Sequence, residues 1–239
     1  MTKLLISVKD LQEARIISSY TNVIDFKNPF IGPLGSWKKK EILSAVNSLG
    51  DRYKLSATIG NIDKNSEILQ KITSYDNLRL DYIKIGIFRD SISNLKSIIS
   101  IVNSQKLKTN IVFVFFVENK NLINFLRNNL NFLHKNNVKF FLLDTMNKSS
   151  GNLLTHTSIN FLRKLIELSN HFNIKIGLAG KIKTENIKEL IKIKPFIIGI
   201  RTAVCKNTNR KLSLSTELAE KLYHKFNSEI KYAQAVAGT

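Results

Sequence analysis

Short apolar runs alternate with longer amphipathic segments along the whole chain. The runs are rich in β-branched and aromatic residues, and in the segments between them apolar residues recur at helical spacing. The pattern predicts eight strands, over residues 4–8, 23–27, 54–59, 81–86, 111–117, 138–144, 174–179 and 196–201. The carboxyl ends of these strands are about 28 residues apart on average, close to the length of one strand–helix unit.

The amphipathic segments predict a helix after each strand. The first helix is expected to begin at Asp10, with Glu13 three residues further on as in a capping box. The predicted helices cover residues 10–20, 37–48, 66–75, 91–104, 119–128, 157–171, 184–193 and 215–235.

A closed (β/α)8 barrel, the TIM-barrel fold of the α/β class, fits this repeat best. No stretch rich in proline and glycine divides the chain, so we expect residues 1–239 to form a single domain. The competing architecture is a doubly wound open sheet, which normally carries a glycine-rich phosphate loop after its first strand. The residues from Ser7 to Asp10 contain no glycine, which favours the barrel.

The chain is strongly basic. Its 239 residues include 37 Lys and Arg against 18 Asp and Glu, a formal net charge of +19. Nucleic-acid-binding proteins often have such a charge, but here the basic residues are spread over the chain without an aromatic pattern or a known RNA-binding motif. We therefore expect a surface that attracts small phosphorylated anions rather than nucleic acid. A non-catalytic nucleic-acid-binding protein remains as an alternative.

Other classes of protein are disfavoured by what the sequence lacks. No apolar run approaches the ~18 residues of a membrane helix, and the N-terminal segment does not resemble a signal peptide, so we expect a cytoplasmic protein without a membrane partner. Cys205 is the only cysteine and cannot form an internal disulfide. The four histidines show no metal-binding spacing, and no metal is expected.

Alternation along the strands places charged side chains inside the predicted barrel. In the second strand, Asp25 and Lys27 alternate with apolar residues that are expected to face the helices, so both point inward. The same rule turns Lys84 inward in the fourth strand. Active sites of such barrels lie at the carboxyl ends of the strands. Further polar residues near these ends are Ser56, Thr58, Asp144 and Arg201.

Two inward lysines favour amine chemistry. A buried ammonium group must be paired or neutralised, and Asp25 and Asp144 are the acids available to Lys27 and Lys84. Burial beside a second cation also favours the neutral amine, which attacks a carbonyl carbon to form a Schiff base. From the pattern alone we predict carbon–carbon bond chemistry on a small phosphorylated carbonyl compound.

A more specific pattern lies in blocks that occur in order along nearly the whole chain. They are VIDFKNP at 23–29, GPLG at 32–35, SATIG at 56–60, DYIKIG at 81–86, LDT at 143–145, LAG at 178–180 and GIR at 199–201. Together they resemble the (5-formylfuran-3-yl)methyl phosphate synthase family of methanofuran biosynthesis, also called 4-(hydroxymethyl)-2-furancarboxaldehyde-phosphate synthase.

The resemblance implies a lyase that needs neither a metal nor another cofactor. Enzymes of this family condense two molecules of glyceraldehyde 3-phosphate into a furan aldehyde phosphate, with loss of phosphate and water. By resemblance, Lys27 forms the Schiff base and Lys84 accepts a proton, with Asp25, Asp144 and Lys148 as further active-site residues. The choice between the two lysines as imine former stays open, because neighbouring amines titrate as a coupled pair.

Two phosphorylated substrates also require anion-binding groups. Barrels of this kind commonly bind phosphate with the loops after the seventh and eighth strands. We expect Arg201 to be the main phosphate ligand, through its bidentate fork. The remaining residues expected to bind substrate or phosphate are Gly180, Lys183, Thr58 and Thr202.

We expect triose phosphates as small-molecule partners and further copies of the chain in a homo-oligomer. The main alternative within the enzyme class is another class I aldolase-type barrel that acts on triose phosphates. Such an enzyme would keep the Schiff-base lysine but would not make a furan.

Overall fold

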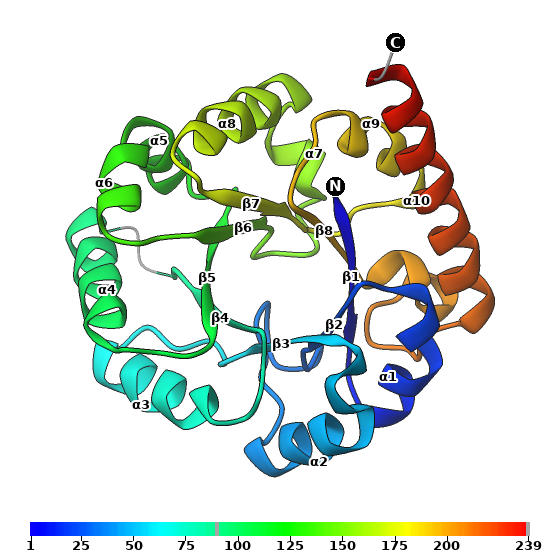
Figure 1. Ribbon diagram of the computed structural model, residues 1–239, viewed down its shortest axis with the longest axis horizontal. Coiled ribbons are helices and arrows are strands. Elements are labelled where there is room, and N and C mark those ends of the chain that lie inside the picture. Colours follow the sequence, from blue (N-terminus) through cyan, green and yellow to red (C-terminus); the bar gives the residue numbers. More distant parts are fainter. Residues whose placement is uncertain (89–90, 238–239) are drawn as a thin grey trace.

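A computed structural model describes residues 1–88 and 91–237, whose parallel strands close into a barrel surrounded by helices (Figure 1). Each strand pairs with its neighbours in chain order, and the first closes the ring against the last. All eight predicted strands are present, and the predicted (β/α)8 fold is confirmed. The strands are β1 (Lys3–Val8), β2 (Val23–Phe26), β3 (Lys54–Thr58), β4 (Tyr82–Gly86), β5 (Asn110–Phe116), β6 (Phe140–Asp144), β7 (Lys175–Leu178) and β8 (Ile197–Ile200).

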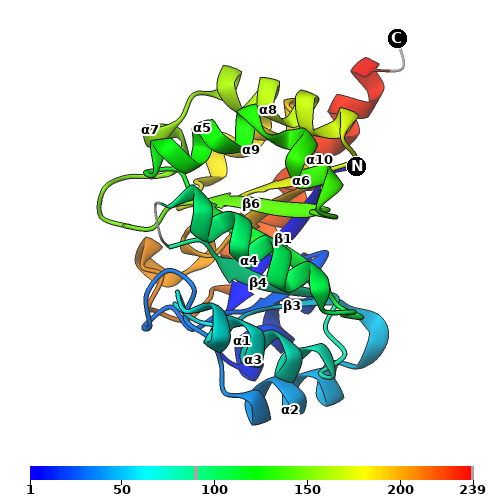
Figure 2. The same cartoon turned by 90° about the vertical axis from the view of Figure 1, so that its left-hand side faces the viewer.

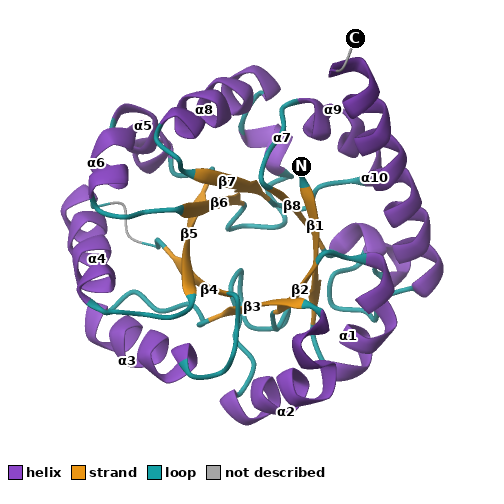
Figure 3. Cartoon of the chain, in the orientation of Figure 1, coloured by secondary structure: helices purple, strands orange, loops and turns teal. Residues whose placement is uncertain are grey.

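The helices form an outer ring around the strands (Figure 3). The sequence does not predict α6 or α7, because only Asn129 separates α6 from α5, and α7 is a single turn. Within the described part of the chain, no helix has both the length and the hydropathy of a membrane span. The helices are α1 (Leu11–Ile17), α2 (Lys39–Leu49), α3 (Asn65–Asp76), α4 (Ile92–Ser104), α5 (Lys120–Asn128), α6 (Leu130–Lys135), α7 (Leu153–His156), α8 (Ile159–His171), α9 (Ile187–Lys192) and α10 (Thr216–Ala237).

Apolar side chains form two layers. The larger layer lies between the barrel and the helices and includes Ile24 and Ile83, the outward neighbours of the predicted site residues. The smaller layer lies inside the barrel. At the start of the strands, Tyr82, Phe140 and Phe196 contact one another through their rings. The amino-terminal end of the barrel interior is therefore apolar and aromatic, which leaves the carboxyl end for polar chemistry.

The loops that follow β2, β6 and β8 lie at this carboxyl end, on the left of Figure 2. The loop after β2 is fixed by Asn61, whose side chain accepts a hydrogen bond from the Leu34 amide and donates one to the Ile31 carbonyl. Thr58 of β3 donates its hydroxyl to the Gly35 carbonyl at 2.8 Å. The loop is therefore anchored to the end of β3 at several points.

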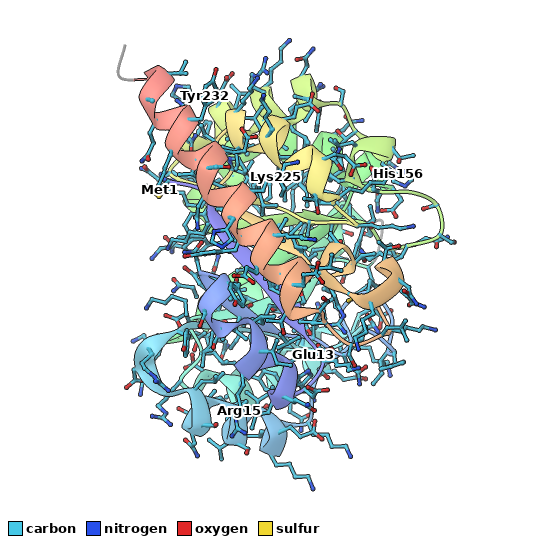
Figure 4. All side chains as sticks on the ribbon, turned by 90° about the vertical axis from the view of Figure 1, so that its right-hand side faces the viewer. Met1, Glu13, Arg15, His156, Lys225 and Tyr232 are labelled. Atoms are coloured by element: carbon cyan, nitrogen blue, oxygen red, sulfur yellow. The ribbon has the colours of Figure 1, made fainter. Side chains whose placement is uncertain are left out.

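A buried ion pair joins α1 to the carboxyl end of the barrel. Glu13, labelled in Figure 4, accepts a 2.8 Å hydrogen bond from Arg201 and bonds from the amides of Lys9 and Leu214. Asp10 caps α1 as predicted, because its side chain accepts from the Glu13 amide. In a capping box the Glu13 carboxylate would accept a hydrogen bond from the Asp10 amide. Here it accepts from the Lys9 amide instead.

We predict that Glu13→Ala lowers the free energy of unfolding by about 3–5 kcal/mol, because it leaves the Arg201 guanidinium buried without its carboxylate. Urea unfolding followed by circular dichroism measures the change. The control is Glu217→Ala, which removes an exposed partner of Lys221 and should leave the unfolding midpoint nearly unchanged. Equal effects of the two substitutions would contradict the structural importance of Glu13.

Candidate active site

The two inward lysines lie at the carboxyl end of the barrel, and each forms an ion pair with a different aspartate. The Lys84 Nζ lies 2.5 Å from Oδ2 of Asp25, and the Lys27 Nζ lies 3.3 Å from Oδ2 of Asp144. Lys27 follows β2 directly, where its amide donates to the Val8 carbonyl and continues the strand pairing. None of the four charged side chains is more than 9% exposed. The pairing of inward lysines with Asp25 and Asp144, expected from the sequence, is confirmed.

Lys148 completes the charged cluster from the loop after β6. Its Nζ donates to Oδ1 of Asp144 at 2.6 Å and also to the hydroxyl and carbonyl of Thr145. Asp144 therefore bridges two ammonium groups, one on each carboxylate oxygen. Burial alone would raise the pKa of Asp144, but Lys148 and Lys27 hold that pKa well below its usual value. Asp144 is therefore an anion at any physiological pH.

Lys27 has the properties of a nucleophilic amine. Burial, the largest effect, lowers the pKa of Lys27 to about 8, with Asp144 opposing the shift and Lys148 and Lys84 adding to it. A substantial fraction of this amine is neutral at pH 7–8, and only the neutral amine attacks a carbonyl. Lys84, in contrast, is tightly bound to Asp25. Of the two lysines, Lys27 is therefore the better candidate for a nucleophile.

A small cavity of about 40 Å³ opens above these lysines. Its walls come from the carboxyl ends of β1, β2, β4, β6, β7 and β8 and from the loops after them. Arg210 reaches the cavity from the loop before α10, a contribution that the sequence analysis did not anticipate. The charged side chains in the walls are Lys27, Lys84, Asp144, Lys148, Lys181, Arg201 and Arg210.

Positive charge exceeds negative charge around this cavity. Glu13 neutralises Arg201, and Asp25 neutralises Lys84. The single charge of Asp144 is then shared by Lys27 and Lys148, while Arg210 adds a further cation. A site with such a surplus attracts anionic substrates such as phosphate esters.

Comparison with known proteins identifies the family. The family model of 4-HFC-P synthase matches residues 4–223. The chain belongs to the 4-HFC-P synthase family. Similar curated proteins are the (5-formylfuran-3-yl)methyl phosphate synthases of Methanococcus aeolicus, 28% identical over 92% of this chain and 97% of that protein, and of Methanosarcina mazei, with the same identity and coverage. The family is one of enzymes, and the resemblance predicted from the sequence is confirmed.

Solved structures show the same fold at low sequence identity. A phosphoribosyl anthranilate isomerase from Thermus thermophilus aligns with a TM-score of 0.67 and 15% identity, over 95% of this chain and 99% of that one. A 3-hexulose-6-phosphate synthase aligns with a TM-score of 0.62 and 13% identity, over 94% and 99% of the two chains. These similarities support the barrel fold of the 4-HFC-P synthase family member.

Three of the residues expected to bind phosphate line the cavity, namely Arg201, Gly180 and Thr202. Thr202 does so at the end of β8, and Gly180 after β7. Gly180 has a φ of +106°, and a Cβ at this position would lie 3.0 Å from the backbone of Thr145, so glycine is required for the close approach. Lys181, in the same loop, also lines the cavity.

The Arg201 fork, expected to hold a phosphate, lies in the cavity wall on protein acceptors. The guanidinium donates to both carboxylate oxygens of Glu13 and to the carbonyls of Ser7, Arg210 and Leu212. Every nitrogen of the fork therefore has a protein acceptor. In this structure Arg201 fixes the wall of the cavity, and its role as a phosphate ligand stays a prediction.

Thr58 and Lys183, also expected to bind substrate or phosphate, lie outside the cavity. Thr58 is fully buried and donates its hydroxyl to the Gly35 carbonyl, so it anchors a loop and does not line the cavity. The side chain of Lys183 is 60% exposed and pairs with Glu185 at 3.4 Å, outside the cavity. Thr58 ends β3 and Lys183 lies in the loop after β7, and their side chains are held by the Gly35 carbonyl and by Glu185.

A larger hollow of about 550 Å³ lies at the opposite, amino-terminal end of the barrel. It is lined by residues from β1, β7 and α10, and by Lys194 and Phe196, and it contains none of the predicted site residues. Among the described residues, no cluster of three or more His, Cys, Asp or Glu side chains is arranged to hold a metal ion.

We predict that acetylation of Lys27 by acetic anhydride reaches half its maximal rate near pH 8, because the neutral amine reacts. Lys148→Gln should move this midpoint upward, since it removes a neighbouring cation and leaves Asp144 to Lys27 alone. Mass spectrometry of the Lys27 peptide across a pH series measures both midpoints.

Lys183→Gln is the control, because that lysine is exposed and distant from the cluster. An acetylation midpoint of Lys27 near pH 10 in the parent protein, or the same midpoint in Lys148→Gln, would show that the cluster does not lower the pKa of this amine.

Proposed function

We propose that the protein condenses two molecules of glyceraldehyde 3-phosphate into (5-formylfuran-3-yl)methyl phosphate, with loss of one phosphate and two waters, as a step of methanofuran biosynthesis. The observation that carries the proposal is the pair of buried amines, Lys27 and Lys84, each on its own aspartate. The family to which the chain belongs supports the product, because its curated relatives are named for this furan.

Lys27 starts the reaction. Its neutral amine adds to the carbonyl carbon of one triose phosphate, a nitrogen–carbon bond forms, and the carbonyl oxygen leaves as water. Lys148, with its ammonium beside Asp144, supplies the proton that the leaving oxygen needs. Asp144 remains ionised and stabilises the positive charge of the resulting imine.

Lys84 moves the proton that makes the carbon nucleophilic. The imine acidifies the adjacent C–H, and the Lys84 amine takes that proton, which leaves an enamine on Lys27. The enamine carbon then attacks the aldehyde of the second triose phosphate and forms the new carbon–carbon bond. Ring closure with loss of phosphate and water leads to the furan, and water releases the product from Lys27.

The surplus positive charge holds the two phosphate groups. Besides Arg201, which Glu13 neutralises, Arg210 and Lys181 line the cavity without being part of the lysine–aspartate cluster. Gly180 allows backbone atoms to come close to a phosphate, and Thr202 adds a hydroxyl at the end of β8. Arg201 and Glu13 keep this wall in position.

We expect the purified protein to convert glyceraldehyde 3-phosphate into a furan aldehyde and free phosphate in equal amounts. Lys27→Ala should abolish both products, because no imine forms. Lys84→Ala should reduce turnover by about 10²–10⁴-fold, the usual contribution of a general base. Furan absorbance and a phosphate assay measure the two products independently.

The anion site is tested in the same assay with a matched pair of cations. Arg210→Ala should raise KM for the triose phosphate, whereas Lys183→Ala should leave KM unchanged because its side chain lies outside the cavity. Imine formation without furan would point to another aldolase-type reaction. If the protein forms neither a furan nor an imine, the proposed enzyme activity is refuted.

A further inference from the structure

Asp25 uses only one of its two carboxylate oxygens. Oδ2 accepts a hydrogen bond from the Ser7 hydroxyl at 2.7 Å and contacts the Lys84 Nζ at 2.5 Å. Oδ1 has no hydrogen-bond partner among the described residues, although Asp25 is completely buried. A buried carboxylate oxygen without a donor costs free energy, so such an atom requires a physical explanation.

A matching unused donor lies on the next strand. The Ser56 hydroxyl is buried and also has no partner among the residues that the structure describes. Ser56 of β3 is the register partner of Asp25 of β2. A buried acceptor without a donor and a buried donor without an acceptor are therefore neighbours in the same layer of the barrel.

Free volume lies beside Ser56. A cavity of about 30 Å³ beneath the active site is lined by Ser56 and Lys84 and by apolar residues such as Leu142 and Ile197. Lys84 thus lies between this cavity and the one above it. This space gives the Ser56 hydroxyl room to change rotamer.

Among the described residues, Lys84 has one acid in contact and several cations nearby. Asp25 is its ion-pair partner on β2, while Lys27, Lys148 and Asp144 form the neighbouring cluster. Arg201 and Arg210 share the upper cavity with Lys84, and Lys175 shares the lower one. When Lys84 is neutral, Asp25 loses its charged donor and keeps only the Ser7 hydroxyl.

We propose that Ser56 is a positioning residue whose hydroxyl turns onto Oδ1 of Asp25 whenever Lys84 is the neutral amine. The structure corresponds to the other state, in which charged Lys84 holds Oδ2 and Ser56 is released. The proton travels from the substrate carbon to the Lys84 Nζ, Asp25 stays a carboxylate throughout, and Ser56 keeps its own proton. This inference rests on the proposed function of Lys84 as proton acceptor.

Three variants test the role of Ser56. Ser56→Ala removes the donor, and Ser56→Thr keeps it, with the lower cavity offering room for the added methyl group. Ser169→Ala is the matched control, because the Ser169 hydroxyl of α8 is equally buried and unpartnered among the described residues but is not part of the site. Thermal unfolding confirms that each variant is folded.

The first readout is the titration of Lys84 by NMR in lysine labelled with 15N, with the Lys84→Arg spectrum for assignment. In Ser56→Ala the Lys84 midpoint should rise by about one pH unit, because the state with neutral Lys84 has lost the hydrogen bond from Ser56 to Asp25. Turnover at pH 7 should then fall about tenfold and recover toward the parent rate in alkaline solution. Ser56→Thr and Ser169→Ala should retain the parent midpoint.

An unchanged Lys84 midpoint in Ser56→Ala, or a loss of turnover that is equal at every pH, would overturn the inference. The NMR titration uses no substrate, so it separates the two claims. A shifted midpoint in a protein that makes no furan would leave the Ser56 inference standing and refute the proposed function. Furan formation with an unshifted Lys84 midpoint would leave the proposed function standing and refute the Ser56 inference.

Discussion

Two ammonium groups inside a barrel of apolar walls are the constraint on which the site depends. An unpaired charge at this depth is too costly to maintain, so each lysine needs a carboxylate within contact distance. Asp25 on β2 and Asp144 at the end of β6 provide them. Because both acids belong to strands of a closed sheet, backbone pairing fixes their positions before any substrate arrives. The two pairs differ, and the proposed roles rest on this difference: Lys84 is held at 2.5 Å by its own aspartate, whereas Lys27 shares Asp144 with Lys148.

The surrounding charges keep this arrangement intact. Glu13 satisfies Arg201 and the amides of Lys9 and Leu214, so one buried carboxylate joins α1, β8 and the segment before α10. The neutral pair of Glu13 and Arg201 forms a wall and leaves Arg210 as a cation for anionic substrates. Local ion pairs thus offset the free-energy cost of burying these charges. The remaining positive charge lies where phosphate groups would bind.

Sequence reasoning succeeded where a side chain's direction follows from regular backbone geometry. The period of two along a strand determines which face a residue occupies, so Asp25, Lys27 and Lys84 were predicted inward and lie there. Asp144 was predicted at a strand end because the apolar run of the sixth strand stops there, and it is the last residue of β6. Short strands with β-branched residues at regular spacing were equally sufficient to predict the barrel.

The sequence was insufficient where loops decide the outcome. Thr58 and Lys183 occupy positions expected of substrate ligands. The Thr58 hydroxyl instead donates to a loop carbonyl, and the Lys183 amine pairs with a surface glutamate. Arg201 was assigned to phosphate because nothing in the local pattern reveals Glu13, which is 188 residues away in sequence. Arg210 lies in a non-periodic loop, and only the folded chain brings it to the cavity.

The central claim is that Lys27 is the residue that bonds covalently to the substrate. Borohydride reduction of the protein with glyceraldehyde 3-phosphate, followed by mass spectrometric peptide mapping, tests it most directly. The account predicts one triose-phosphate adduct, on Lys27, which persists in Lys84→Ala and is lost in Lys27→Ala. An adduct on Lys84 in the parent protein, or no adduct on either lysine while furan is formed, would contradict the account.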